Sequence, residues 1–290
     1  MDNTKLSLMT FTLDIDMAMK KMTAVECLLL AKNAGIGAVD VMDPSEARLR
    51  EYQAAAEQTG VRPLCYIGTV SFFCGRADKI RSTLARQLAA AQQLGAKLYM
   101  IVPMDVRRDE KRCRKLGKEQ VRDCLRRYFS MAVSMAEGTG IRVCFETTPR
   151  DYTGLSGTED CRWILRQVPE LGLVYDTANM LPHGDDPLAY YEALKDRILH
   201  VHVKDVALRP ATWKDKLFHS EMAKSGEVMT CCVPGRGVIP LRQILTRMEQ
   251  DGYAGTYALE YSHPPRYPAD PATNAARLAE HLAFWQEDKE

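Results

Sequence analysis

The stretch KIRSTLARQLAAAQQLGAKLYMIV (residues 79–102) contains the pattern from which the fold is predicted. Apolar residues recur at helical spacing through its first part, which predicts a helix over Lys79–Leu94. One face of that helix carries Ile80, Leu84, Leu88 and Ala91. Gly95 then supplies the left-handed residue that ends a helix at little cost, and the apolar run Lys97–Val102 predicts a strand. The stretch therefore predicts a crossover helix and the next strand of a parallel sheet.

The same alternation of helical pattern and short apolar run extends along the whole chain. A second helix is predicted over Thr23–Asn33, and further helix-ending glycines stand at Gly35, Gly60 and Gly140. Alternating helices and strands are typical of a parallel sheet with crossover helices. The predicted strands are Lys5–Thr10, Ala38–Met42, Arg62–Tyr66, Lys97–Val102, Arg142–Glu146, Leu171–Asp176, Ile198–His202 and Thr256–Glu260.

The number of strands decides the architecture. Dividing 290 residues by the predicted strands leaves about 36 residues per unit, which suits a (β/α)8 barrel of roughly 250 residues with some longer loops. The chain contains no linker rich in Pro, Gly or Ser and no break in composition. We therefore predict an α/β protein with one domain, a (β/α)8 TIM barrel, over residues 1–290.

One unit is longer than the others. From His202 to Glu260 is 58 residues, against 26 residues from Asp176 to His202. We interpret residues 206–237 as an extended loop inserted after the seventh strand, near the active site. Long insertions in barrels lie on the loops that follow strands, so this one is either a lid over the site or a surface loop.

Strands five to eight each end in a residue that can bind a metal ion. These residues are Glu146, Asp176, His202 and Glu260. The C-terminal ends of barrel strands meet on one face of the barrel, where catalytic groups lie. We therefore expect the four side chains to converge. His200, by contrast, is expected to be structural and to point toward the helical layer.

Buried carboxylates at strand ends need a compensating charge, and a divalent cation supplies one. Three carboxylates and one imidazole form a hard, mostly oxygen donor set, which favours Mn²⁺ and also suits Mg²⁺, Co²⁺ or Zn²⁺. The alternative is that each residue caps its own strand and pairs with Lys or Arg. Because four such residues follow one another in successive strands, we favour the metal site.

Several motifs together resemble a known family. They are His200-Val-His-Val-Lys-Asp-Val206, Asp176-Thr-Ala-Asn-Met180, Gly184-Asp-Asp-Pro187, Phe145-Glu-Thr147, Pro234-Gly-Arg-Gly-Val-Ile239 and Ala31-Lys-Asn-Ala-Gly-Ile-Gly-Ala-Val-Asp40. Their order and spacing resemble the xylose-isomerase-like superfamily of sugar phosphate isomerases and epimerases over nearly the full chain.

The resemblance implies a metal ion held by Glu146, Asp176, His202 and Glu260. It also implies that Glu146 and Glu260 transfer protons on opposite faces of the substrate. The chemistry is consistent, because a metal ion bound to a hydroxyl and its neighbouring carbonyl stabilises the enediolate and so acidifies the C–H bond between them. A carboxylate beside that carbon can then take the proton.

Four further residues are candidates for substrate binding. Asn179 resembles a family position that contacts substrate oxygens. Lys204 shares its strand face with His202 and can hold a substrate oxygen, or it neutralises a carboxylate. Arg236, between two glycines, either binds an anionic or hydroxylated substrate or is a solvated turn residue. His183 lies near the same rim, as a ligand contact or as a loop histidine.

Composition limits the partners. Thirty-nine Lys and Arg against thirty-eight Asp and Glu give a net charge of +1, which disfavours binding to nucleic acid or to an anionic membrane surface. Nine cysteines without a CxxC pair, and the lack of a leader pattern or of a long apolar run, predict a cytoplasmic protein. A small sugar or polyol is the expected partner, and a homo-oligomer is compatible with the resemblance.

The predicted function is a metal-dependent isomerase or epimerase of a sugar, keto-sugar or related polyol. Because the inserted region resembles inosose-dehydratase-like members, a dehydratase of a keto-polyol is the leading alternative. A sugar-binding subunit without turnover is a third reading. The superfamily also includes endonuclease IV, an enzyme that cleaves abasic DNA, but six histidines and a near-zero net charge argue against that activity.

Overall fold

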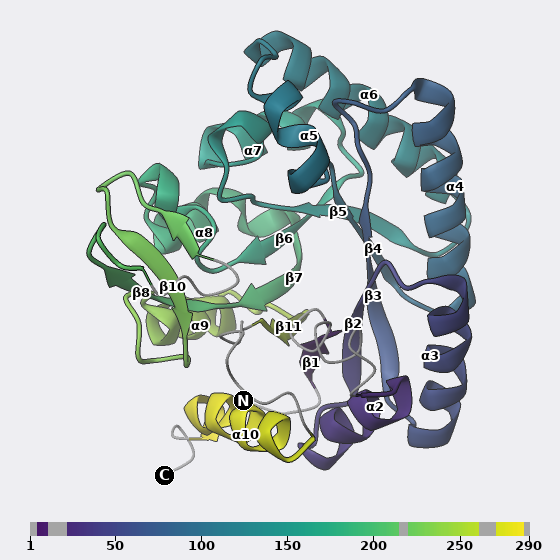
Figure 1. The fold of residues 1–290 in the computed structure, drawn as a ribbon, viewed down its shortest axis with the longest axis vertical. Helices are drawn as coiled ribbons and strands as arrows, with labels where there is room; N and C mark the ends of the chain where they lie inside the picture. Colours follow the sequence, from purple (N-terminus) through teal and green to yellow (C-terminus); the bar gives the residue numbers. More distant parts are fainter. Residues whose placement is uncertain (1–4, 11–21, 215–219, 261–270, 287–290) are drawn as a thin grey trace.

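The computed structural model describes residues 5–10, 22–214, 220–260 and 271–286. Its centre is a closed barrel of eight parallel strands in the order β1-β11-β7-β6-β5-β4-β3-β2, surrounded by helices (Figure 1). This confirms the predicted (β/α)8 TIM barrel. The barrel strands are β1 (Leu6–Met9), β2 (Ala38–Met42), β3 (Arg62–Thr69), β4 (Leu98–Val102), β5 (Arg142–Glu146), β6 (Gly172–Asp176), β7 (Ile198–Val203) and β11 (Thr256–Leu259).

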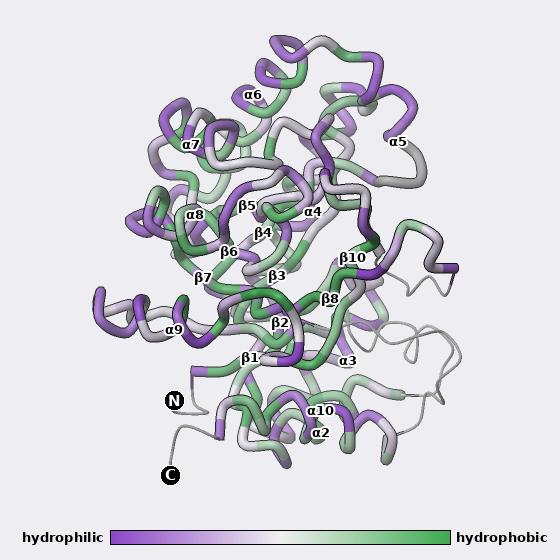
Figure 2. The backbone as a smooth tube through the Cα atoms, turned by 90° about the vertical axis from the view of Figure 1, so that its left-hand side faces the viewer, coloured by the Kyte–Doolittle hydropathy of each residue, from purple (hydrophilic) through white to green (hydrophobic). Residues whose placement is uncertain are grey.

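The helices lie outside the barrel and alternate apolar with polar positions, as Figure 2 shows for α6, α7 and α9. Apolar side chains of the helices pack on the outward faces of the strands, which removes them from water. The helices are α2 (Ala24–Asn33), α3 (Glu46–Thr59), α4 (Ala77–Gln93), α5 (Val106–Cys113), α6 (Lys118–Ala136), α7 (Thr158–Gln167), α8 (Pro187–Leu194), α9 (Leu241–Gln250) and α10 (Pro271–Gln286), with short 3-10 turns at Asp151–Thr153, Leu181–His183 and Lys195–Arg197.

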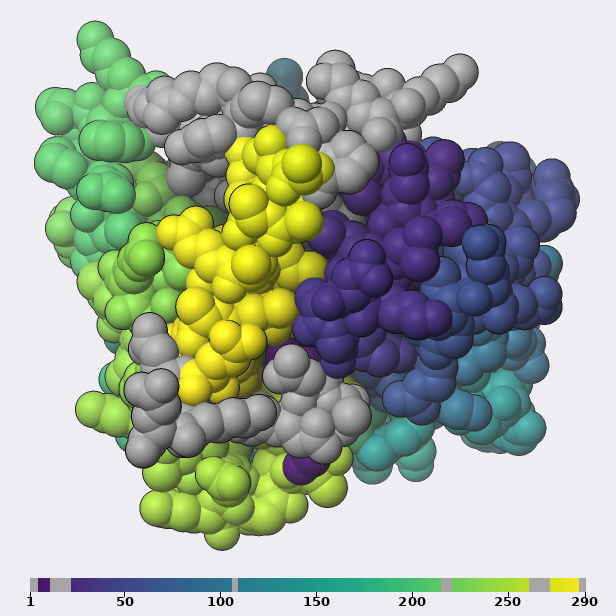
Figure 3. Space-filling view, turned by 90° about the horizontal axis from the view of Figure 1, so that it is seen from below, coloured from purple at the N-terminus to yellow at the C-terminus, as the bar shows by residue number. Residues whose placement is uncertain are grey.

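Local signals set the helix ends much as predicted. Helix α2 begins with a capping box, in which the Glu26 backbone N–H donates to Thr23 Oγ1 and the Thr23 backbone N–H donates to Glu26 Oε2. The glycine after α3, Gly60, has a φ of 76°, which only glycine adopts without strain. Figure 3 shows the last helix, α10, lying beside α2, so that helices from opposite parts of the sequence pack together on one side of the barrel.

Strand β3 is longer than predicted. It continues to Thr69 because Ile67, Gly68 and Thr69 pair with residues 100–102 of β4. Inside the barrel, apolar side chains from several strands form a second hydrophobic cluster, which extends up to the cavity at the C-terminal strand ends. This group consists of Met9, Cys65, Ile67, Leu98, Met100, Cys144 and Val174.

The extended loop after β7 contains a small antiparallel sheet, which the sequence analysis did not predict. Its strands are β8 (Asp205–Arg209), β10 (Val228–Cys232) and β9 (Ser220–Met222), paired in that order. Residues 215–219 of the predicted insertion lie outside the described residues. Among the described residues, no helix combines the length and hydrophobicity that a membrane crossing requires.

The carboxylate of Asp205 ties this sheet to the chain that leads into α9. It accepts hydrogen bonds from the backbone N–H groups of Gly235 (2.8 Å), Gly237 (2.9 Å) and Ile239 (3.2 Å), and from Val206 beside it (2.8 Å). A Cβ atom on Gly237 would lie 2.1 Å from Asp205 Oδ1. Glycine is therefore required where the chain closes around Asp205.

Replacing Asp205 by Ala is expected to destabilise the protein by about 3 kcal/mol, because several buried N–H groups lose a charged acceptor. Urea unfolding measures this. Asp186→Ala is the matched control, since Asp186 caps α8 through one backbone N–H, and loss of a cap costs about 1 kcal/mol. Equal destabilisation by the two variants would contradict the role given to Asp205.

Candidate metal centre

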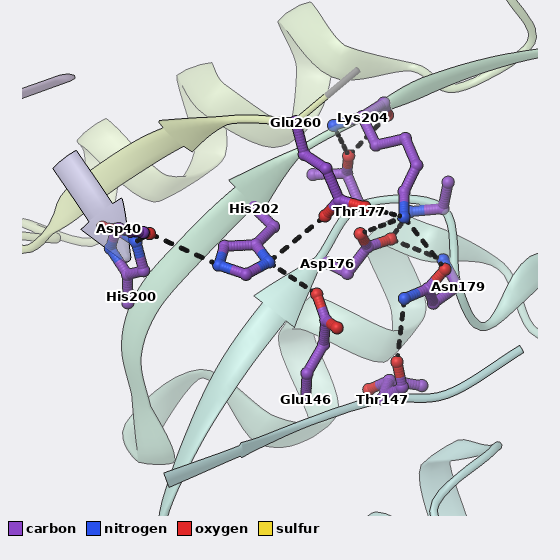
Figure 4. Close-up of polar contacts among 11 residues, drawn as sticks. Asp40, Glu146, Thr147, Asp176, Thr177, Asn179, His200, His202, Lys204 and Glu260 are labelled. Atoms are coloured by element: carbon purple, nitrogen blue, oxygen red, sulfur yellow. Dashed lines mark hydrogen bonds and ion pairs between the residues drawn. The ribbon is translucent and has the colours of Figure 1, made fainter. Parts of the chain in front are cut away.

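Four side chains from neighbouring strands converge at the C-terminal end of the barrel (Figure 4). Glu146 ends β5, Asp176 ends β6, His202 lies near the end of β7, and Glu260 follows β11. Each offers one ligand atom, and these atoms all lie within 4.8 Å of one another. The structure thus brings together the four residues proposed as metal ligands.

The geometry around His202 directs one ring nitrogen into this cluster. His202 Nδ1 lies 2.6 Å from Glu146 Oε1 and 3.2 Å from Glu260 Oε2. The imidazole is fully buried. Burial alone would lower the pKa of His202, but the adjacent Glu146 carboxylate, together with Asp40 and Glu260, raises that pKa well above its ordinary value.

Asp176 is anchored by the backbone that follows it. Its Oδ1 accepts hydrogen bonds from the backbone N–H groups of Ala178 (2.8 Å) and Asn179 (2.7 Å). Complete burial raises the pKa of Asp176 to about 7, with the Glu260 and Glu146 charges adding to the rise and Lys204 opposing it. This site therefore carries more negative charge than its own side chains neutralise.

Lys204 brings a positively charged ammonium group into the cluster. Its Nζ lies 2.9 Å from Asp176 Oδ2 and 2.7 Å from Glu260 Oε1, and it donates to Asn179 Oδ1 at 3.2 Å. Although burial would raise the pKa of Glu260, Lys204 and His202 hold that pKa well below its usual range. This placement is consistent with both roles predicted for Lys204. It neutralises carboxylates, and it lines the cavity, where it can hold a substrate oxygen.

The donor set fits a divalent cation. Among the described residues, the buried oxygens Asp176 Oδ2 and Glu260 Oε2 each have one cationic neighbour, Lys204 Nζ at 2.9 Å and His202 Nδ1 at 3.2 Å, but neither contact has the geometry of a hydrogen bond. Unsatisfied buried carboxylate oxygens are costly, and a hard cation would satisfy both. Three carboxylates and one imidazole nitrogen also leave room in the coordination shell for water or substrate.

A cavity of about 200 Å³ opens above the cluster. Glu146, Glu260, Lys204 and Asn179 form its polar side. The remaining wall is largely apolar and includes Met9, Met42, Ile67, Met100 and Val102 of the barrel together with Val206, Met229 and Cys231 of the inserted sheet. The insertion therefore forms one side of the cavity wall.

The structure places the three other residues proposed for substrate binding in different surroundings. Asn179 lines the cavity, but its Nδ2 donates to the Thr147 carbonyl at 2.9 Å and its Oδ1 accepts from Lys204, so it holds the lysine in place. His183 lines an adjoining outer cavity of about 770 Å³. Arg236 is not brought to the cluster: its side chain is 69% exposed and pairs with Glu280 of α10.

The glycines on either side of Arg236 were expected to allow a close approach to a ligand, but they have another role. They let the backbone close around Asp205 and not around a ligand, and this directs Arg236 outward. The predicted direction of His200, toward the helical layer, is wrong. Residues two apart along a strand share a face, and His200 Nε2 lies inside the barrel, 2.7 Å from Asp40 Oδ2.

Three residues near the cavity were missed by sequence reasoning. Asp40 is a carboxylate within the apolar run of β2, and it shares a face with Met42, which was a usable signal. Arg150 and Glu221 form an ion pair of 2.6 Å between the chain after β5 and β9, at the boundary shared by the two cavities. No sequence pattern joins residues 71 positions apart in this way.

Replacing Glu221 by Ala is expected to let β9 separate from the barrel more often. The pair is worth about 1 kcal/mol, and so its loss should accelerate hydrogen exchange of the Ser220–Met222 amides about fivefold. Mass spectrometry of exchanged peptides measures this rate. Glu51→Ala, which removes an equally short pair with Arg48 on α3, should leave β9 unchanged. Unchanged exchange of β9 in Glu221→Ala would contradict the role of the pair.

Comparison with known proteins agrees with this fold. A family model described as xylose isomerase-like TIM barrel matches residues 28–287. An inosose dehydratase from Geobacillus thermodenitrificans (strain NG80-2) is 29% identical over 134 residues, which are 45% of this chain and 44% of that protein. The chain thus matches less than half the length of this relative.

Two solved structures have the same fold. A crystal structure of the IOLI protein with a binding zinc atom covers 97% of this chain and 99% of its own, with 19% identity and a TM-score of 0.69. The 3-keto-D-glucoside 4-epimerase YcjR from E. coli covers 98% and 99%, with 16% identity and a TM-score of 0.71. At these identities the likeness establishes the fold alone.

Proposed function

Because the chain belongs to the xylose isomerase-like TIM barrel family, we propose that it is a divalent-metal-dependent isomerase or epimerase of a sugar, keto-sugar or related polyol. The observation that carries the proposal is the convergence of three carboxylates and one imidazole nitrogen within 4.8 Å, two of the carboxylates lining a cavity. This donor set has both the ligands for a cation and the bases for proton transfer.

Glu146, Asp176, His202 and Glu260 would hold the ion. Mn²⁺ fits the mostly oxygen donors best, and the zinc atom bound by the similar IOLI structure supports metal binding by a protein of this fold. When bound, a divalent cation polarises a carbonyl and the hydroxyl next to it, which acidifies the C–H bond between them.

The protein's own residues then move the proton. Glu146 and Glu260 both line the cavity, so each can take a proton from, or return it to, a carbon held there. Lys204 Nζ is a donor for a substrate oxygen as negative charge develops on it. Asn179 holds that lysine, and the inserted sheet with its apolar Met229 limits the entry of water.

A second candidate is dehydration of a keto-polyol. The observation in its favour is the similarity to the inosose dehydratase, which carries that activity in its name. The first step would be the same proton removal. The two reactions differ afterwards, since a dehydratase expels a hydroxyl next to the carbon that loses its proton, whereas an isomerase returns a proton to the substrate.

Solvent deuterium distinguishes the candidates. The protein is stripped with a chelator, reloaded separately with Mn²⁺, Mg²⁺, Co²⁺ or Zn²⁺, and incubated with ketoses and keto-inositols in D₂O. Deuterium incorporation with no loss of water supports isomerisation or epimerisation, and a new enone absorbance supports dehydration. Equal incorporation in stripped and reloaded protein would contradict metal dependence.

A further inference from the structure

A second polar cluster lies inside the barrel below the metal centre. It consists of Asp40 from β2 and His200 and His202 from β7, and all three side chains are fully buried. Asp40 Oδ2 lies 2.7 Å from His200 Nε2 and 3.5 Å from His202 Nε2 (Figure 4). Buried polar groups in an otherwise apolar barrel are costly, so this arrangement calls for a physical reason.

The hydrogen-bond acceptors in this cluster determine which nitrogen of His200 carries a proton. A carboxylate only accepts hydrogen bonds, so His200 carries a proton on Nε2 and donates it to Asp40. On its other side, His200 Nδ1 lies 2.7 Å from Thr256 Oγ1 of β11, which can donate its hydroxyl proton to that nitrogen. His200 is thus held at both nitrogens, and it fixes the Asp40 carboxylate in turn.

The two nitrogens of His202 face opposite partners. Nδ1 faces Glu146 and Glu260, whereas Nε2 faces Asp40. An imidazole that binds a cation through Nδ1 must offer a lone pair there and carry its remaining proton on Nε2. The Asp40 carboxylate, 3.5 Å from Nε2 and without a hydrogen bond to it, favours that tautomer and ring orientation by electrostatic attraction.

We propose that Asp40 is a positioning residue for the metal centre: held by His200 and Thr256, it fixes the tautomer and the orientation of His202. The inference rests on the metal site of the proposed function. It adds to that site three residues that lie behind His202, namely Thr256 of β11, His200 of β7 and Asp40 of β2. Asp40 would act through His202 and would not touch the substrate.

The same three residues could instead hold a second metal ion, since one ligand atom from each lies within 4.8 Å of the others. The distances favour the hydrogen-bonded interpretation. His200 Nε2 and Asp40 Oδ2 are already at hydrogen-bond distance, and the second nitrogen of His200 is engaged by Thr256. The stoichiometry of bound metal separates the two interpretations.

The test measures metal binding directly, independently of turnover. Isothermal titration of the stripped protein with Mn²⁺ gives the stoichiometry and the Kd, and the visible spectrum of the Co²⁺ form reports the ligand field. For Asp40→Asn we expect one ion per chain, a Kd raised roughly 10- to 100-fold and a changed Co²⁺ spectrum. Thr256→Val keeps Asp40 and should raise the Kd roughly threefold to tenfold, as expected for one hydrogen bond.

Asp109→Asn is the matched control. Asp109 is also fully buried, and its Oδ2 accepts a hydrogen bond from the Asp105 backbone N–H at the start of α5. This variant should retain the wild-type Kd and Co²⁺ spectrum. If Asp40→Asn and Thr256→Val also retained both, the positioning role would be refuted. If the wild type bound two ions and Asp40→Asn bound one, Asp40 would be a ligand of a second metal ion and not a positioning residue. If the wild type bound no ion, the metal site on which the inference rests would be refuted.

Discussion

Replacing Glu260 by Gln is expected to lower the rate of substrate deuterium exchange about 10²- to 10⁴-fold, the usual contribution of a positioned proton-transfer group. Glu260 lines the cavity and its carboxylate is held by Lys204 and His202, which keep it ionised and able to accept a proton. Glutamine has the same shape and keeps one oxygen as a weaker metal ligand, but it cannot act as a base. Glu146→Gln should show a similar loss.

The measurement is deuterium incorporation in D₂O at saturating Mn²⁺, with bound metal determined for every variant. This separates a lost base from a lost ligand, because only the first reduces exchange at full metal occupancy. Glu249→Gln, an exposed substitution on α9, is the control and should exchange at the wild-type rate. Persistent exchange in both metal-loaded active-site variants would refute the assignment of these two bases.

Replacing Lys204 by Met should lower the free energy of unfolding of the metal-free protein by about 3–5 kcal/mol, the usual effect of removing one partner from a buried ion pair. The reason is electrostatic. Without the ammonium group, Asp176, Glu260 and Glu146 are left as largely buried carboxylates that repel one another. Saturating Mn²⁺ should then restore more stability to the variant than it adds to the wild type.

Urea unfolding with and without Mn²⁺ checks both statements. Lys195→Met is the matched control, because Lys195 also contacts two carboxylates, Glu192 and Asp251, but at the surface. Its loss should cost far less than the loss of Lys204, as is usual for an ion pair at the surface. If Lys204→Met were no less stable than Lys195→Met in the absence of metal, then Lys204 would not be the group that balances the buried charge.

The parts of the site that the sequence predicted are those that follow from strand periodicity. Glu146 and Asp176 each end an apolar run, and in a parallel barrel such ends meet on one face whatever the details of packing. Lys204 was placed correctly beside His202 by the same period of two. Local pattern was sufficient here because the barrel itself brings the strand ends together.

The parts that were missed depend on contacts between distant residues. Asp40 and His200 are 160 positions apart, and nothing local to either residue indicates that they pair. Arg236 was misjudged because glycines on both sides are consistent with a bound ligand and equally with a nearby carboxylate, and only the fold shows that the partner is Asp205. The inserted sheet depends on the pairing of β8 with β10, which local sequence specifies only weakly.

The attachment of the inserted sheet has a consequence for protein redesign. Asp205 anchors the insertion to the chain before α9, and it follows Lys204 directly in the sequence. The residue that anchors the insertion and the residue that neutralises carboxylates of the candidate metal centre are therefore neighbours in the chain. Residues 210–214 and 220–227 lie outside that anchor, and Glu221 among them lines the cavity. Exchanging this part of the insertion between related proteins is therefore the change that would alter the cavity wall while leaving the candidate metal centre unchanged.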